Sequence, residues 1–158
     1  MNNTNLNKMN EILTELHKQH QSGQQKYTYF LLTAAGACIG FATDKAQGVP
    51  LYLGLVFLTE AVLFWGLSFY FGCKCATSVQ ILLQSNHNLI ALENGVHPQQ
   101  PQHPEMLEAA LKGVKSASDE IMQKSLNYNN WQFWFFVAGG IAFVLWRITE
   151  IVRLAPKG

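Results

Sequence analysis

The segment from residue 46 to residue 73 contains a single charged side chain, that of Glu60. The hydrocarbon core of a bilayer is about 30 Å thick, and a helix needs roughly 20 apolar residues to cross it. Residues 50–72 provide that length, and Glu60 lies near their middle. An apolar stretch of this length predicts a membrane-spanning helix, so we expect an integral membrane protein.

Two further windows, 27–43 and 125–146, also contain no charged residue, and Lys, Arg or Asp brackets all three windows. Tyrosines and tryptophans gather near the window ends, where their rings favour the headgroup layer of a bilayer. No strand pattern or internal repeat competes with helices. The sequence therefore predicts an all-α fold, a helical integral membrane protein with three transmembrane helices.

Four regions are expected along the chain: an amphipathic N-terminal helix in 1–26, a transmembrane helical hairpin in 27–72, a cytoplasmic helical hairpin in 73–126, and a third transmembrane helix with a short tail in 127–158. Helices are predicted near 4–20, 27–43, 50–94, 105–126 and 129–154. The N-terminal helix carries an apolar stripe at spacings of three and four, formed by Leu6, Met9, Leu13 and Leu16.

The cytoplasmic hairpin is expected to turn at 96–104, a stretch rich in proline, glutamine and histidine. Asn94 and Gly95 predict the end of its first arm, and Pro104 suits the first turn of its second. Arms 73–94 and 105–126 match in length, at roughly 33 Å each for 1.5 Å per residue. With the N-terminal helix alongside, they are expected to form a three-helix cytoplasmic bundle.

Lysine and arginine place the N-terminus and the 73–126 segment in the cytoplasm, and we expect a bacterial inner membrane. Three spans would then leave Arg147, Arg153 and Lys157 outside, although Lys and Arg usually concentrate on the cytoplasmic side. Either the earlier charges dominate, or the third window bends at Gly139 and Gly140 and re-enters, which would keep both termini inside.

Glu60 allows two interpretations. Antiparallel pairing around a loop centred near residue 46 or 47 places it level with Thr33, within three residues, so its carboxyl could hydrogen-bond there or to a neighbouring subunit and hold helices together. Alternatively it is a proton or cation site in a pore or transport path. An apolar row flanks it and predicts either packing or a pore face: Phe57, Phe64, Leu67 and Phe71.

Small residues predict tight helix contacts. Gly36 and Gly40 form a GxxxG pair that lets two backbones approach closely. A second series of small residues recurs every seven positions, and the first span of the same chain could pack against it: Gly54, Ala61, Ser68 and Cys75. Gly139 and Gly140 form a third small patch.

Several classes of function are not expected. A net charge of +1 without a basic stripe argues against binding nucleic acid. No nucleophile elbow, phosphate loop or paired-carboxylate arrangement predicts an enzyme or a cofactor. Cys73 and Cys75 lack the second ligand pair of a structural zinc site, so no metal is predicted.

The leading hypothesis is a non-catalytic protein that self-assembles in the lipid bilayer as a homo-oligomer and forms or gates an ion-conducting or membrane-disrupting assembly. The order of amphipathic helix, two-span hairpin and long cytoplasmic helix resembles small membrane effectors of bacterial anti-phage systems, in architecture alone. Two alternatives stay open: a membrane scaffold or immunity-type protein whose cytoplasmic hairpin binds a protein partner, and a small proton-coupled transporter that uses Glu60.

Overall fold

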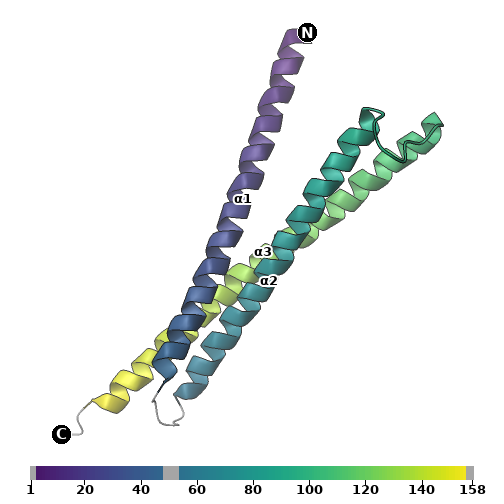
Figure 1. Ribbon diagram of the computed structural model, residues 1–158. Coiled ribbons are helices and arrows are strands. Elements are labelled where there is room, and N and C mark those ends of the chain that lie inside the picture. The colour runs from purple at the N-terminus through teal and green to yellow at the C-terminus, as the bar shows by residue number, and fades with distance from the viewer. Residues whose placement is uncertain (1–2, 48–53, 156–158) are drawn as a thin grey trace.

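The computed structural model describes residues 3–47 and 54–155, with side chains from residue 22 onward except that of Gln24. It contains three helices, α1 (Asn3–Ala46), α2 (Leu55–Glu93) and α3 (Pro104–Leu154), and the described residues form no strand. The predicted all-α class is confirmed. Figure 1 shows α2 and α3 as a long antiparallel hairpin, with α1 alongside part of it.

The sequence predicts five helices and the structure has three, because each of two predicted pairs forms one continuous helix. Segments 4–20 and 27–43 both belong to α1, and 105–126 and 129–154 both belong to α3. Neither 21–26 nor 127–128 contains proline, so nothing there removes a backbone donor. Gly23 costs only about 1 kcal/mol relative to alanine, which the rest of a long helix offsets. The alternative with a bend at Gly139 and Gly140 is also wrong, since α3 continues through both.

The hairpin turn begins where the sequence predicts it. Gly95 adopts a positive φ of 72°, which glycine reaches without a steric penalty. The Val96 amide donates to the Ala91 carbonyl at 3.0 Å and the Gly95 amide to the Leu92 carbonyl at 3.2 Å. These two bonds form a Schellman motif, which satisfies the last carbonyls of α2 and reverses the chain.

One hydrogen-bonded group fixes how the three helices align. The Cys75 sulfur lies 3.8 Å from the Thr28 hydroxyl and 3.4 Å from the Ser125 hydroxyl, which joins α2 to both other helices. Each helix has a lysine within three residues of this contact, so three cationic side chains lie at one level of the bundle: Lys26, Lys74 and Lys124.

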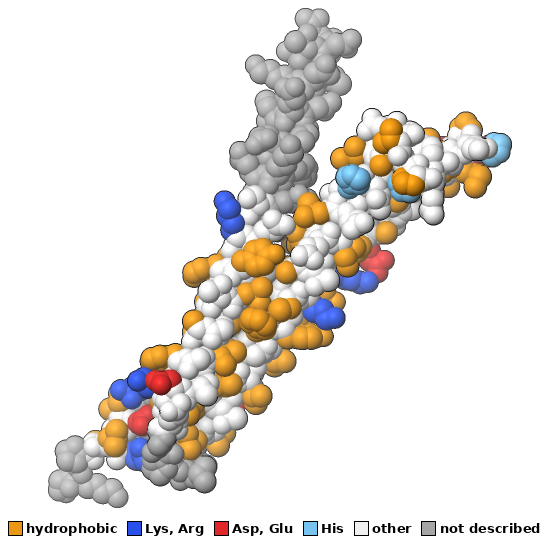
Figure 2. All heavy atoms as spheres, viewed as in Figure 1, with side chains coloured by type: hydrophobic (Ala, Val, Ile, Leu, Met, Phe, Trp, Pro, Cys, Tyr) orange, Lys and Arg blue, Asp and Glu red, His pale blue; other side chains and the backbone are white. Residues whose placement is uncertain are grey.

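Charged residues return at a second level, close to the turn between α1 and α2. There the Phe41 and Phe143 rings of α1 and α3 are 5.9 Å apart, just before Asp44 and Lys45 on α1 and Arg147 on α3. We call the part between the two charged levels the apolar belt: residues 27–43, 55–73 and 125–146. On the face drawn in Figure 2, charged side chains gather toward both ends of this belt and hydrophobic ones cover it.

The belt has the dimensions of a bilayer core. Its α2 portion is roughly 28 Å long at 1.5 Å per residue, close to the hydrocarbon thickness of about 30 Å. By length and composition, α2 and α3 are each apolar enough to cross a membrane, whereas α1 is not among the described helices that pass this test. Tyrosines and threonines lower the mean hydropathy of residues 27–43.

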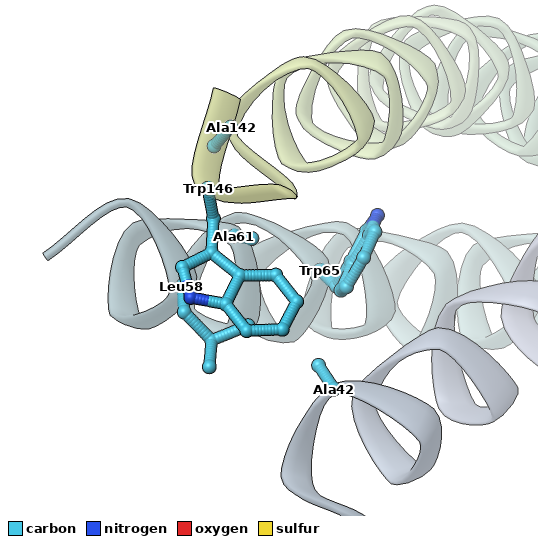
Figure 3. Packing of buried hydrophobic residues seen from close by; sticks show 6 residues of the cluster. All are labelled: Ala42, Leu58, Ala61, Trp65, Ala142 and Trp146. Carbon is cyan, nitrogen blue, oxygen red and sulfur yellow. The ribbon is translucent and has the colours of Figure 1, made fainter. Parts of the chain in front are cut away.

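The core of the belt is built from large aromatic side chains packed against small ones. Trp146 of α3 is almost fully buried and lies over Leu58 and Ala61 of α2, while Ala42 approaches from α1 (Figure 3). Within the belt, the buried positions of each helix follow one another at spacings of three, four or seven, as in coiled-coil packing.

Toward its N-terminus α1 diverges from the hairpin instead of packing along it (Figure 1). The expected three-helix bundle beyond the apolar belt is therefore absent, and α2 and α3 pair there without α1. A continuous α1 explains the difference, because a straight helix cannot turn at 21–26 to follow the hairpin. The stripe of Leu6, Met9, Leu13 and Leu16 lies outside the side chains that the structure describes.

Candidate functional site

Glu60 is exposed on the surface of the apolar belt. No hydrogen bond or ion pair joins its carboxyl to any other described residue, and its neighbours one turn away on either side, Val56 and Leu63, are exposed apolar side chains. An acidic side chain on a lipid-facing surface is costly, by an amount that decreases toward the membrane interface. On a lipid-facing surface, the desolvation of this carboxyl would be compensated by no described residue of the same chain.

Glu60 lies nearer one end of the belt than its position in the sequence suggests. Starting from the contact between Thr28 and Cys75, fifteen residues back along α2 lead to Glu60, and fifteen forward along antiparallel α1 lead to Thr43. Thr43 directly precedes the charged Asp44. The carboxyl thus lies about one turn from the charged level at the α1–α2 turn, instead of at mid-membrane.

The expected pairing of Glu60 with Thr33 does not occur within the chain. Thr33 is about ten residues, or about 15 Å, from the level of Glu60, and its hydroxyl donates to the Tyr29 carbonyl at 3.0 Å. The predicted pairing assumes a loop centred near residue 46 or 47, whereas α1 continues to Ala46 and α2 begins at Leu55. The contact between Thr28 and Cys75 corresponds to a centre about five residues later, which shifts the residue opposite Glu60 by about ten.

The aromatic row beside Glu60 packs against α3. Phe64 and Phe71 both stack on Phe135, with ring centroids 6.2 Å and 5.5 Å away, and Phe57 is half-buried. Leu67 remains exposed. These rings fill the groove between α2 and α3, so they line no opening inside a single chain.

The GxxxG pair of α1 faces away from the bundle. Gly36 and Gly40 are exposed, and a Cβ atom added at either would meet no described atom within 4 Å. The glycines therefore make no close contact with the other helices in the part of the chain that the structure describes. They leave a smooth surface on which another helix could approach.

The small residues of α2 lie on its buried face. Ala61, Ser68 and Cys75 are buried, as is Gly54 at the N-cap of α2. The series meets both neighbouring helices: Ser68 donates to the Gln132 carbonyl of α3 at 2.8 Å, and the Cys75 sulfur lies 3.8 Å from the Thr28 hydroxyl of α1. The two glycines of the third patch differ. A Cβ at Gly139 would lie 2.6 Å from Trp65 Cδ1, whereas one at Gly140 would meet nothing within 4 Å.

A buried polar cluster joins the three helices at the lysine end of the belt. Thr28 lies at its centre: its hydroxyl donates to the Asn129 side-chain oxygen at 3.4 Å, and its carbonyl accepts from Gln132 Nε2 at 3.3 Å. Cys75 and Ser125 complete it through their 3.4 Å contact. Buried polar groups between apolar helices contribute about 0.6 to 2 kcal/mol each, so the cluster holds α1 where it begins to diverge.

Gln132 is the most constrained member of the polar cluster. Its side chain is fully buried, its Oε1 has no hydrogen-bond partner among the described residues, and a Cβ at Gly72 would lie only 2.5 Å from its Nε2. This cluster was not predicted from the sequence. Ser125, Asn129 and Gln132 do recur there at spacings of four and three, but Asn127 and Asn130 lie among them and obscure the pattern.

A buried acid, Glu150, lies just beyond the opposite end of the belt. The Glu150 carboxylate is nearly buried, with Arg147 and Arg153 nitrogens 3.8 Å and 3.7 Å away, so its charge is balanced. The indole nitrogen of Trp146, one turn earlier, has no hydrogen-bond partner among the described residues. Glu60 differs from Glu150 in having no cation within the described chain.

The described residues hold no group of three or more His, Cys, Asp or Glu side chains that could bind a metal ion. No family model matches the sequence, and no curated protein or solved structure matches it either. The function must therefore be argued from the residues of this chain alone.

Proposed function

We propose that this chain is a non-catalytic membrane protein that self-assembles in the bilayer and forms or gates an ion-conducting or membrane-disrupting assembly. All three helices cross the membrane along the apolar belt. The N-terminus and the hairpin beyond Lys74 lie in the cytoplasm, and the membrane is the bacterial inner membrane. The protein would act as an effector of the defence type.

The observation that carries this proposal is the unpartnered carboxyl of Glu60 on an apolar surface. Facing lipid, the carboxyl raises the free energy, and no contact with a described residue of the chain offsets that cost. A neighbouring copy that covers Glu60 removes this cost, so the carboxyl favours assembly. The outward-facing Gly36 and Gly40 provide a second reason, because they serve no close contact among the described residues.

Any conducting path would lie between copies. Within one chain the core of the belt is filled by Trp65 and Trp146, and the side chains of the polar cluster hydrogen-bond to one another and to the backbone. Glu60 lies on the outer surface, where subunits would meet. In an assembly, its carboxyls would form a ring near the outer mouth, as acidic rings do in cation channels.

The Glu60→Gln variant tests this function by ion flux into liposomes that contain the purified protein. The amide keeps the size and hydrogen-bonding capacity of the side chain but cannot ionise, so we expect cation flux to decrease about tenfold, which corresponds to about 1.4 kcal/mol. The pH dependence of the remaining flux should also flatten. Glu105→Gln, an exposed acid on the hairpin outside the belt, is the matched control.

Wild-type protein that stays monomeric in lipid nanodiscs, or flux that Glu60→Gln leaves unchanged at every pH, would contradict the proposal.

One observation favours a scaffold as a second candidate. The hairpin beyond the belt exposes large apolar side chains although it would lie in water: Ile81, Leu83, Ile90, Met106 and Met122. A protein partner that binds this surface would be lost when Ile90 is replaced by glutamate, and flux would be unaffected. Chemical cross-linking in intact cells, wild type against Ile90→Glu, measures that difference.

A further inference from the structure

We propose that the copies assemble head to tail, with Glu60 of one copy packed against the surface of the next copy that Gly36, Gly40 and Thr43 form on α1. This inference rests on the proposed self-assembly and specifies its interface. We call the α1 surface the glycine face. The occupant of the glycine face is the α2 surface of a second copy.

The glycine face has the chemistry that a carboxyl requires. Gly36, Gly40 and Thr43 follow one another at spacings of four and three, so they share one side of α1, and all three are exposed. The two glycines let a neighbouring helix approach closely. The Thr43 hydroxyl donates its proton to the Ile39 carbonyl at 2.6 Å, which leaves its oxygen free to accept one. A carboxyl group in its neutral form is such a donor.

The depths of the two surfaces agree. Through the contact between Thr28 and Cys75, Glu60 lies level with Thr43 inside a single chain. Copies inserted in the same orientation share this level, since they are related by rotation about the membrane normal. Bringing two copies together side by side therefore places Glu60 of one opposite Thr43 of the other without vertical displacement.

The two surfaces belong to different helices, which makes the contact head to tail. Glu60 lies on the flank of α2 that carries Phe64 and Phe71, and both of these stack on Phe135 of α3. The glycine face lies on α1. A symmetric contact through the glycine face would leave Glu60 in lipid, and a symmetric contact through Glu60 would leave the glycines unused. Only a heterologous contact covers both, and such contacts close into rings when the rotation permits.

Disulfide cross-linking between two differently tagged chains in membranes tests the interface. One chain carries Thr43→Cys and the other Leu63→Cys, one turn from Glu60, and both have Cys38→Ala, Cys73→Ser and Cys75→Ser, so that only the introduced thiols react. Leu63 is exposed and Glu60 itself is kept. Mixed expression should give a cross-linked product that contains both tags, and neither chain expressed alone should cross-link.

Cross-linking of the Thr43→Cys chain to itself, or of the Leu63→Cys chain to itself, would show a symmetric interface and overturn the proposal. Absence of all three products, with both chains folded in the membrane, would overturn it as well. The readout is independent of conduction: head-to-tail products in a protein without flux would contradict the proposed activity and support this interface.

A matched pair of glycine variants provides a second test. Gly40→Leu adds bulk to the glycine face, whereas Gly66→Leu adds the same bulk to an exposed position of α2 where no described atom lies within 4 Å. We expect at least a tenfold loss of the mixed cross-link for Gly40→Leu and none for Gly66→Leu. Equal yields from the two variants would contradict the proposal.

Discussion

Replacing Gly139 with leucine is expected to destabilise the helical bundle by about 3 kcal/mol or more, at the upper end of the cost of overpacking a core. A Cβ atom at this position would lie 2.6 Å from Cδ1 and 2.7 Å from Nε1 of Trp65. Trp65 cannot move away freely, because it is buried and its indole N–H donates to the Phe136 carbonyl at 3.2 Å. Unfolding followed by circular dichroism in detergent, as denaturant is added, measures the loss.

The neighbouring glycine is the control. Gly140→Leu introduces the same side chain one residue later, where a Cβ meets no described atom within 4 Å, so its free energy of unfolding should not decrease and should rise by up to about 1 kcal/mol through helix propensity. Equal losses from the two variants would mean that α3 packs on α2 through another face. The pair separates packing from any effect of glycine on helix propensity, which both substitutions share.

A Thr28→Cys substitution is expected to form a disulfide with the native Cys75 and stabilise the fold by about 2–4 kcal/mol. The Thr28 hydroxyl oxygen and the Cys75 sulfur are already 3.8 Å apart. The bond would close the long loop that contains the α1–α2 turn and would hold α1 to the hairpin below its point of divergence. The shift of the unfolding midpoint between oxidised and reduced protein measures the gain, in a background with Cys38→Ala and Cys73→Ser.

The same Thr28→Cys chain with Cys75→Ser has no second thiol, so its midpoint should not respond to reductant. A folded Thr28→Cys protein that remains reduced under oxidising conditions would show that α1 does not lie beside Cys75. That result would also remove the basis for the depth assigned to Glu60, because this contact sets the register between α1 and α2.

The positions of the apolar windows and of the hairpin turn could be predicted from the sequence because both depend on local composition. Charges bracket each window, and Asn94 with Gly95 ends α2 where a positive φ is needed. Helix continuity could not be predicted from the same signals. Weakly apolar stretches such as 21–26 interrupt the hydropathy pattern without interrupting the backbone, since a helix ends only where its hydrogen bonds end.

Part of the candidate site was also visible in the sequence. Glu60 stands out because a charge in an apolar window is rare, and Gly36 with Gly40 forms a recognisable pair. The polar cluster around Thr28 and Gln132 was missed, because threonine and glutamine are common in helices. Their hydrogen bonds can be recognised only when the packing of the three helices is known.

The all-helical class, the strongly apolar segment with its single charge and the end of α2 all follow from the order of the residues. Hydrophobic length, glycine conformation and charge are properties of neighbouring residues, so no tertiary contact is needed to predict them. The level of Glu60 beside Thr43 and the outward direction of the glycine face emerge only when the helices pack. The register between two helices depends on where their loop is centred, and the face that a helix exposes depends on which of its side chains interdigitate with its neighbours. Both are set by contacts between residues far apart in the chain.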